Sequence, residues 1–205
     1  PDGRSTLWWQ PADLSGAAEQ LVSSPGKDIW EGELTPDGKF VVYRTGSLGT
    51  ADIWYRRLSG DSVEKGIAAT KFTENSPGVS PDGRWVAYSS DVSGSTQVYV
   101  QPFPGPGAQV PVSVTGGNVP VWSRDGRRLF FTNGSRMMAA SVVTGPSFSV
   151  TLPELLFEGN YQTGTGHASY DVTPDGKSFL MLRPVVGRSE EIVVIYNWAA
   201  VEAKK

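Results

Sequence analysis

Short runs of alternating apolar and polar residues recur along the chain, and an Asp-Gly turn introduces each of them. In the run after the second turn, Val86 and Tyr88 point to one side of an extended strand and Trp85 points to the other. The turn suits a hairpin, because its proline fixes φ and its glycine accepts the positive φ that closes the turn. The pattern therefore predicts antiparallel strands joined by tight turns.

The turn unit occurs four times at similar intervals. Its aspartates lie at positions 37, 82, 125 and 175, so the intervals are 45, 43 and 50 residues. A period in the forties with several short strands in each repeat is typical of β-propeller blades. The residues expected to form these structural turns are Asp37, Gly38, Asp82, Gly83, Asp125, Gly126, Asp175 and Gly176.

The strand after each turn carries bulky apolar residues at the third and fifth positions after the glycine. These positions share one face of a strand, so they predict a buried sheet face in every repeat. The residues at these positions are Val41, Tyr43, Val86, Tyr88, Leu129, Phe131, Phe179 and Met181.

Each repeat divides into four predicted strands, and the innermost strand of each precedes the Asp-Gly turn. The outer strand of the third repeat is predicted at 148–151. The chain is thus predicted to be all-β and to form one partial propeller of about four to five four-stranded antiparallel blades. Its predicted parts are a half blade at 1–24, full blades at 28–73, 75–115 and 118–158, a three-stranded last blade at 168–198 and a polar tail at 199–205.

The two ends of this arrangement can be completed in two ways. An open arc would expose apolar blade faces and unpaired strand edges, which would favour self-association of the chain. Alternatively, the N-terminal strands at 7–10 and 19–22 would fold back onto the last blade and close a small ring.

Composition narrows the classes of partner. The net charge is −3, and no basic run exceeds short pairs such as Arg56-Arg57, so we expect no nucleic-acid partner. Cysteine is absent, which removes disulfides and thiolate chemistry. No apolar stretch approaches the ~18 residues of a membrane span. We therefore expect no membrane span within this sequence.

The motifs that carry catalysis are missing from this sequence. A kinase requires a glycine-rich phosphate loop and Asp-Phe-Gly, and a serine hydrolase requires Gly-x-Ser-x-Gly with a histidine partner. The only histidine is His167, and no calcium-loop pattern occurs. We expect no catalysis by this chain, no metal and no cofactor.

The candidate ligand- or partner-binding residues are Trp30, Glu31, Asn75, Asn118 and His167. The first four lie at or near the starts of innermost strands, which line the centre of a propeller. Trp30 is placed at the rim of that channel and Glu31 along its polar lining. His167 belongs to a long polar connection, where it is either a solvated histidine or a ligand contact near the channel mouth.

The Ser-Pro-Asp-Gly repeat resembles the WD40-like propeller repeat, as in the TolB propeller. Further downstream the chain is similar to the C-terminal propellers of bacterial membrane serine/threonine kinases. The stretches that carry this similarity are 68–72, 80–90, 98–105 and the Asn197-Trp198 ending. Arg124 departs from the pattern, because the repeat has proline there.

The resemblance implies a six-bladed, extracytoplasmic propeller that serves as a sensor or interaction module for a protein partner or a small ligand. Because the first blades are missing here, we expect the chain to be the C-terminal part of a bacterial signalling protein. Two alternatives stay open: the accessory propeller of a prolyl-oligopeptidase-type serine peptidase, and a free-standing periplasmic TolB-like protein. A propeller fold does not itself decide between them.

Overall fold

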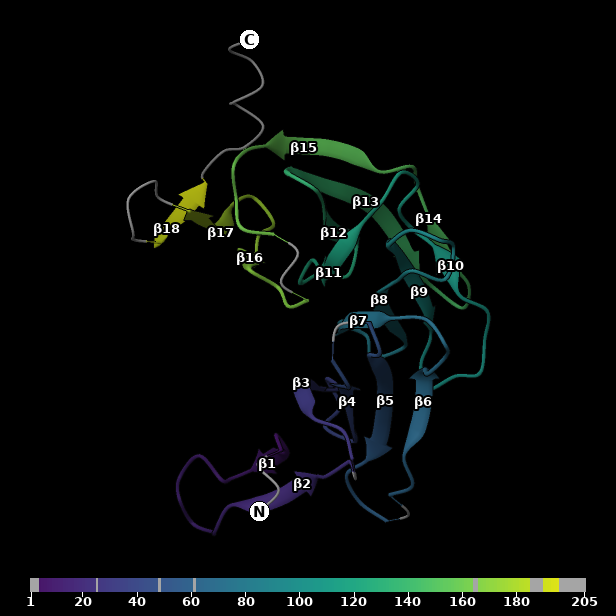
Figure 1. The fold of residues 1–205 in the computed structure, drawn as a ribbon, viewed down its shortest axis with the longest axis vertical. Helices are drawn as coiled ribbons and strands as arrows, with labels where there is room; N and C mark the ends of the chain where they lie inside the picture. Colours follow the sequence, from purple (N-terminus) through teal and green to yellow (C-terminus); the bar gives the residue numbers. More distant parts are fainter. Residues whose placement is uncertain are drawn as a thin grey trace.

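The structure of the protein is a computed structural model, which describes residues 4–24, 26–47, 49–60, 62–163, 166–184 and, as backbone alone, 190–195. Within these ranges every regular element is a β-strand, and the strands form five antiparallel sheets. The sheets follow one another around an open arc (Figure 1). The predicted all-β fold and partial propeller are confirmed.

Each sheet is built from strands that are consecutive in the sequence. The first sheet contains β1 (Leu7–Trp9) and β2 (Glu19–Val22), and the second contains β3 (Ile29–Leu34), β4 (Phe40–Thr45), β5 (Asp52–Arg57) and β6 (Lys65–Ala68). The third contains β7 (Glu74–Val79), β8 (Trp85–Ser90), β9 (Gln97–Pro102) and β10 (Val110–Pro111). The fourth contains β11 (Asn118–Trp122), β12 (Arg128–Asn133), β13 (Arg136–Thr144), β14 (Phe148–Val150) and β15 (Glu154–Glu158), and the fifth contains β16 (Tyr170–Val172), β17 (Phe179–Pro184) and β18 (Glu190–Ile195).

The fourth sheet differs from the prediction in its outer strand. The nine-residue β13 extends beyond β12, and β14 pairs only with that extension, from Val142 to Thr144. The chain then returns as β15, which pairs with β13 from Arg136 to Ala139 and takes the position of the fourth strand. The strand β15 was not predicted from the sequence. It forms because Leu156 and Phe157 enter the core beside β13.

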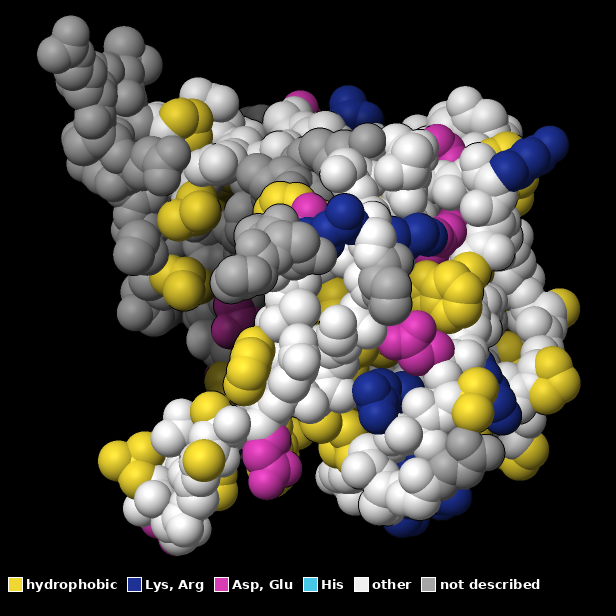
Figure 2. All heavy atoms as spheres, turned by 60° about the horizontal axis from the view of Figure 1, so that its bottom comes forward, with side chains coloured by type: hydrophobic (Ala, Val, Ile, Leu, Met, Phe, Trp, Pro, Cys, Tyr) yellow, Lys and Arg dark blue, Asp and Glu magenta, His cyan; other side chains and the backbone are white. Residues whose placement is uncertain are grey.

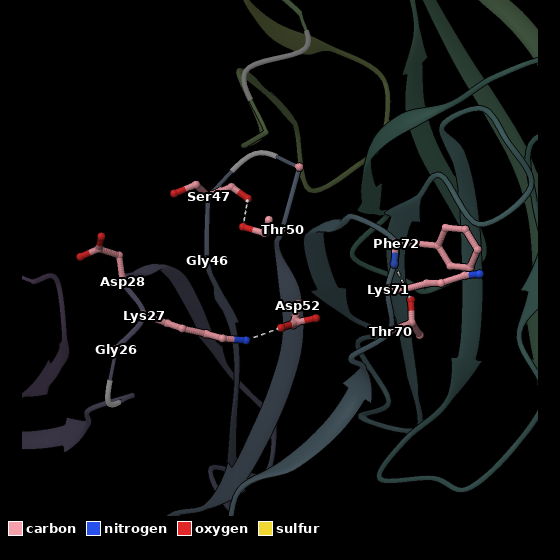
Figure 3. A pocket seen from close by; sticks show the side chains of 11 residues that line it. Gly26, Lys27, Asp28, Gly46, Ser47, Thr50, Asp52, Thr70, Lys71 and Phe72 are labelled. Atoms are coloured by element: carbon pink, nitrogen blue, oxygen red, sulfur yellow. Dashed lines mark hydrogen bonds and ion pairs between the residues drawn. The ribbon is translucent and has the colours of Figure 1, made fainter.

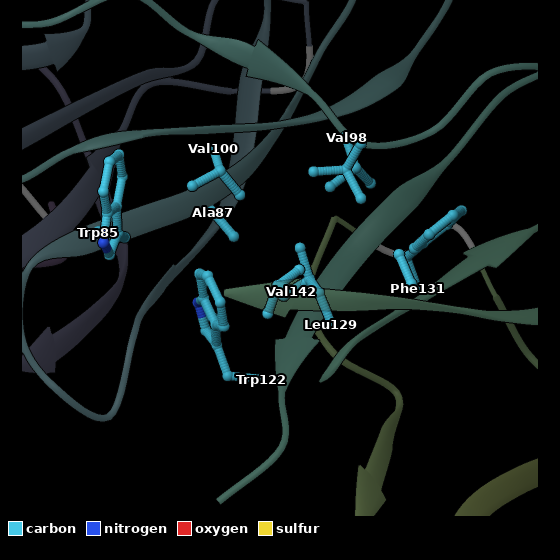
Figure 4. Packing of buried hydrophobic residues seen from close by; sticks show 10 residues of the cluster. Trp85, Ala87, Val98, Val100, Trp122, Leu129, Phe131 and Val142 are labelled. Atoms are coloured by element: carbon cyan, nitrogen blue, oxygen red, sulfur yellow. The ribbon is translucent and has the colours of Figure 1, made fainter. Parts of the chain in front are cut away.

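Neighbouring sheets pack in one repeated direction. The strand after each turn has two faces. We call the face that carries the fourth residue after the turn glycine the forward face, and the face that carries the third and fifth residues the rear face. The forward-face residues are Val42, Ala87, Phe130 and Leu180. Each buried forward face shares a core cluster with the rear face of the next sheet, and Figure 4 shows the cluster around Ala87. These clusters join Val42 with Val86 and Tyr88, Ala87 with Leu129 and Phe131, and Phe130 with Phe179 and Met181.

All the rear-face residues are buried, as predicted. Burial of the fourth position was not predicted, yet Val42, Ala87 and Phe130 are each 0% exposed. Both faces are covered because a sheet inside the arc lies between two others. Leu180, at the same position in the last sheet, is 42% exposed.

The two ends of the arc do not meet. Within the described residues β1 pairs only with β2, and this small sheet packs through Leu7 and Val22 against Val41 and Tyr43 of the next sheet. In Figure 1 the first and last sheets lie at opposite tips of the arc. The alternative in which the N-terminal strands close a small ring is therefore not adopted.

The four Asp-Gly turns share one hydrogen-bond pattern. The hydroxyl group of Thr35, Ser80, Ser123 or Thr173 donates to the aspartate two residues later, over 2.6 to 2.7 Å. The same carboxylate accepts the backbone N–H of the residue after the glycine at 3.1 Å. All four glycines have positive φ, between 67° and 70°, which explains the use of glycine there.

These hydrogen bonds lower the pKa of the turn aspartates. At Asp37 the bonds from Thr35 and Lys39 lower the pKa from 3.8 to about 2. At Asp82 partial burial raises the pKa, but hydrogen bonds from Ser80 and Arg84 outweigh it and the pKa is lowered. The pKa values of Asp125 and Asp175 are lowered chiefly by the bond from the turn hydroxyl.

We expect the four turn aspartates to make the free energy of unfolding depend on pH between about pH 4 and 2. A depressed pKa adds stability above the ordinary value of 3.8, and this stability is lost as the pH falls towards about 2. Urea midpoints measured from pH 6 downwards should therefore decline between about pH 4 and 2. Changing all four aspartates to asparagine should flatten this decline, whereas an unchanged profile would show that the turns do not cause it.

Candidate functional site

The connections between successive sheets lie on one side of the arc, at the strand ends opposite the Asp-Gly turns. We call this the crossover end, because it holds the links from one sheet to the next, including 23–28, 69–73 and 159–169, together with the β4–β5 loop at 46–51. The antiparallel order places the four Asp-Gly turns at the other end, the turn end. All five candidate binding residues lie at the crossover end.

A polar network at the crossover end joins residues that are far apart in the sequence. Arg44 of β4 donates from Nε to Glu31 Oε1 at 2.7 Å and approaches Asn75 Oδ1 with Nη1 at 3.5 Å. Its Nη2 lies 3.4 Å from His167 Nε2, and His167 Nδ1 lies 3.3 Å from Glu31 Oε2. The network thus links two neighbouring sheets to the β15–β16 connection.

The Arg44 guanidinium group determines which ring nitrogen of His167 carries a proton in this geometry. Arginine offers only donors, so His167 Nε2 accepts from Arg44 and His167 Nδ1 carries the proton that faces Glu31. The Arg44 side chain is only 3% exposed, whereas those of Glu31 and His167 are 23% and 43% exposed. The buried cation therefore positions a carboxylate and an imidazole that solvent can reach.

Irregular inner strands bring backbone groups to the network. β7 shifts register between Asn75 and Gly78, and Ser76 has a positive φ of 52°. Ser76 N donates to Glu31 Oε1 at 3.2 Å, and Ser76 Oγ donates to the Gly166 carbonyl at 3.0 Å. A non-glycine residue in this conformation is uncommon and is held only where surrounding contacts define it.

The connection that carries His167 is anchored on both sides. Tyr161 packs edge-on against Phe157, with ring centroids 5.9 Å apart. Gln162 N donates to the Leu182 carbonyl at 2.8 Å, and Ser169 Oγ donates to the Gln162 carbonyl at 2.6 Å. These contacts explain how a polar stretch presents His167 at a defined position.

A polar pocket of about 440 Å³ opens beside the network (Figure 3). Lys27 reaches across it to Asp52 at 2.6 Å, Ser47 and Thr50 line it from the β4–β5 loop, and Thr70, Lys71 and Phe72 line it beyond Asp52. The pocket adjoins the network just beyond β4, since its lining includes Gly46, two residues after Arg44. The crossover end therefore offers a polar surface larger than the network alone.

A buried glutamate supports the wall of this pocket. Glu74 is 1% exposed and accepts a hydrogen bond from the pocket residue Thr70, Oγ1 to Oε1, at 2.7 Å. Burial raises the pKa of Glu74, and the negative charge of Asp52 adds to the effect. The second oxygen of Glu74 has no hydrogen-bond partner among the described residues.

The structure brings together three of the five candidate residues: Glu31, Asn75 and His167. Trp30 lies next to Glu31 at the register shift of β3, with 49% of its surface exposed. Asn118 does not join the network; its side chain accepts the N–H of Val119 at 3.0 Å.

Arg44, the residue at the centre of the network, was not among the residues predicted from the sequence. The sixth position after the turn glycine is Arg44, Ser89, Thr132 or Leu182, so Arg44 is the one charged residue at this repeat position. That departure from the repeat is the signal that could have identified it.

The side chains of the site can form hydrogen bonds and ion pairs. No group of three His, Asp or Glu side chains within the described ranges is placed to hold a metal ion. On the face shown in Figure 2, Lys and Arg side chains alternate with Asp and Glu, so neither sign dominates that face. The part of the chain that the structure describes has no helix long and apolar enough to cross a membrane.

Comparison with known proteins identifies the class of fold. No protein-family model and no curated protein sequence matches the chain. Among solved structures, TolB from Acinetobacter baumannii is 18% identical, with a TM-score of 0.67 over 94% of this chain and 46% of that one. A puromycin-hydrolyzing peptidase from Mycobacterium tuberculosis is 17% identical, with a TM-score of 0.66 over 94% of this chain and 36% of that one. An oligogalacturonate lyase is 14% identical, with a TM-score of 0.64 over 89% and 52%.

These similarities show a TolB-like β-propeller fold. The chain spans about half the length of the TolB structure, at 46%. Because the similar structures include a peptidase and a lyase as well as TolB, the fold is compatible with several functions.

Proposed function

We propose that this chain is a non-catalytic interaction module that binds a segment of a protein partner at its crossover end. The observation that carries the proposal is the Glu31–Arg44–His167 network, in which a buried guanidinium group positions an accessible carboxylate and imidazole. Loops held on a rigid scaffold commonly carry binding function. The second class of ligand is a small polar molecule that donates hydrogen bonds or carries positive charge.

The exposed groups favour a ligand that donates hydrogen bonds or carries positive charge. Glu31 offers carboxylate oxygens, and Glu33 adds a second carboxylate two residues along the same strand. Trp30 offers an exposed indole, whose face attracts Lys or Arg side chains. A peptide segment with a basic side chain is the ligand that these groups fit together.

The wider context of the module is also part of the proposal. The kinase-like stretches support a place in the extracytoplasmic part of a bacterial signalling protein, such as a membrane serine/threonine kinase. The similarity to the mycobacterial peptidase structure supports the alternative of an accessory propeller in a serine peptidase. A free-standing periplasmic TolB-like protein is the third context. In the first two contexts, a kinase or peptidase catalytic domain would lie outside this sequence.

Selection from a displayed random-peptide library tests the proposed site. Peptides enriched on the purified chain should carry basic residues, and Trp30→Ala or His167→Ala should weaken their binding about tenfold or more, as for a central interface residue. Affinity would be measured by isothermal titration calorimetry with synthetic peptides.

Trp9→Ala is the matched control, because Trp9 and Trp30 are 47% and 49% exposed. The control should bind the selected peptides as the parent does. Peptides whose affinity is unchanged by both Trp30→Ala and His167→Ala would contradict the assignment of the site to the crossover end.

A further inference from the structure

The polar pocket at the crossover end contains a fixed carboxylate and a replaceable cation. Lys27 Nζ donates to Asp52 Oδ2 at 2.6 Å (Figure 3). The Asp52 side chain is only 12% exposed, whereas the Lys27 side chain is 43% exposed. The ion pair of a partly exposed lysine contributes little to stability, because the long side chain loses conformational freedom when it is held in one place. Another cation can therefore replace the Lys27 ammonium group while the carboxylate stays where it is.

Two hydroxyl groups of the pocket lining are available as hydrogen-bond acceptors. Thr70 Oγ1 donates its hydrogen to Glu74 Oε1 at 2.7 Å, and Thr50 Oγ1 donates to a backbone carbonyl of its own loop at 3.4 Å. A hydroxyl group has one hydrogen to donate and two lone pairs that accept. Thr70 Oγ1 accepts one backbone N–H, from Phe72 at 3.0 Å, so a lone pair remains. Beside Asp52, the threonine oxygens thus suit a ligand that donates hydrogen bonds.

An aromatic ring adds to the preference for a cation. Lys27 Nζ lies over the Trp54 ring, 5.9 Å from its centroid. The face of an indole ring attracts an ammonium group. A carboxylate, hydroxyl oxygens and an aromatic face together match a group that has a positive charge and three donors, as an ammonium group has. The Lys27 side chain demonstrates the fit, because it already holds an ammonium group in this place.

We propose that this pocket binds a lysine side chain of the partner, whose ammonium group displaces that of Lys27. This inference rests on the proposed function, since it names the basic side chain that the crossover end recognises. Lys27 then acts as an internal competitor, which lowers the affinity for the ligand. Lysine is preferred to arginine, because a single ammonium nitrogen fills the place beside Asp52, whereas a guanidinium group is planar and carries its donors in a fixed fork.

Binding of Nα-acetyl-lysine methylamide to the full chain, followed by NMR titration, tests this assignment. Lys27→Ala removes the competing ammonium group, so it should bind the probe about tenfold more tightly than the parent, as when a site that is open about a tenth of the time becomes fully open. Lys27→Gln should show a similar gain, because it removes the charge but keeps a long side chain. Adding Asp52→Asn to Lys27→Ala should abolish the gain. The corresponding arginine derivative should bind Lys27→Ala several-fold more weakly than the lysine derivative.

Lys39→Ala is the matched control. Lys39 also pairs with an aspartate, Asp37 at 3.1 Å, but this pair lies at the turn end. The control makes the same change in net charge and should bind the probe as the parent does. Because the probe is a single amino-acid derivative, its result is distinguishable from a failure of peptide binding at Trp30 and His167.

Three results overturn the proposal. One is a gain in Lys39→Ala equal to that in Lys27→Ala, which would show a general effect of charge. Another is an affinity of both Lys27 variants that is no higher than that of the parent, absence of binding included. The third is a preference of Lys27→Ala for the arginine derivative.

Discussion

Replacing Arg44 with methionine is expected to lower the free energy of unfolding by about 3 kcal/mol, at the lower end of the range for breaking a buried ion pair. The Arg44 side chain is 3% exposed, and its removal leaves Glu31 without its cation. The expected loss stays at the lower end because the Glu31 side chain keeps 23% exposure. Urea unfolding followed by tryptophan fluorescence measures the change.

A second substitution separates the effect of the unpaired charge on stability from the effect of lost packing. Adding Glu31→Gln to Arg44→Met removes the unpaired carboxylate but keeps an oxygen that can accept the N–H of Ser76. The double variant should therefore recover about 1 kcal/mol or more relative to Arg44→Met. An Arg44→Met variant within about 0.5 kcal/mol of the parent, the range of ordinary surface changes, would contradict the structural role of the network.

Replacing Phe130 with alanine is expected to cost about 3 to 5 kcal/mol of unfolding free energy, as for a large aromatic residue in a core. Phe130 is 0% exposed and packs edge-on against Phe179 of the next sheet, with ring centroids 5.1 Å apart. Its loss would leave a cavity between the fourth and fifth sheets. Chemical denaturation monitored by circular dichroism measures the effect.

The repeat supplies a matched control for this substitution. Leu180 occupies the same repeat position in the last sheet but is 42% exposed, so Leu180→Ala should cost less than about 1 kcal/mol. The loss of unfolding free energy should be several-fold larger for Phe130→Ala than for Leu180→Ala. Equal losses would mean that the forward face of the last sheet is as well covered as that of the fourth.

Local signals were sufficient to predict most of the fold. Each Asp-Gly turn combines a glycine that accepts positive φ with an aspartate bonded within its own turn, so the pattern is visible in consecutive residues. The alternation after each turn then identifies the second strand. The outer strand β15 was missed because its position depends on β13 extending beyond its neighbour, and no residue within β15 signals that.

The candidate site was predictable only in part, because it also depends on contacts between residues that are far apart in the sequence. Innermost strands line the centre of a propeller, which is why Glu31 and Asn75 could be selected from their repeat positions. Arg44 and His167 are 123 residues apart, and their contact depends on the path of the β15–β16 connection. A buried arginine in a strand also looks like an exposed polar residue until its partners are known.

Hydrogen–deuterium exchange on the chain with a selected peptide bound tests the central claim most directly. Binding at the crossover end predicts slower exchange in 26–33, 44–52 and 159–169, with the Asp-Gly turns unchanged. These segments contain most of the pocket lining, the network residues Glu31 and Arg44, and the connection that carries His167. Protection confined to the turn end, around 80–84 and 123–127, would contradict the account.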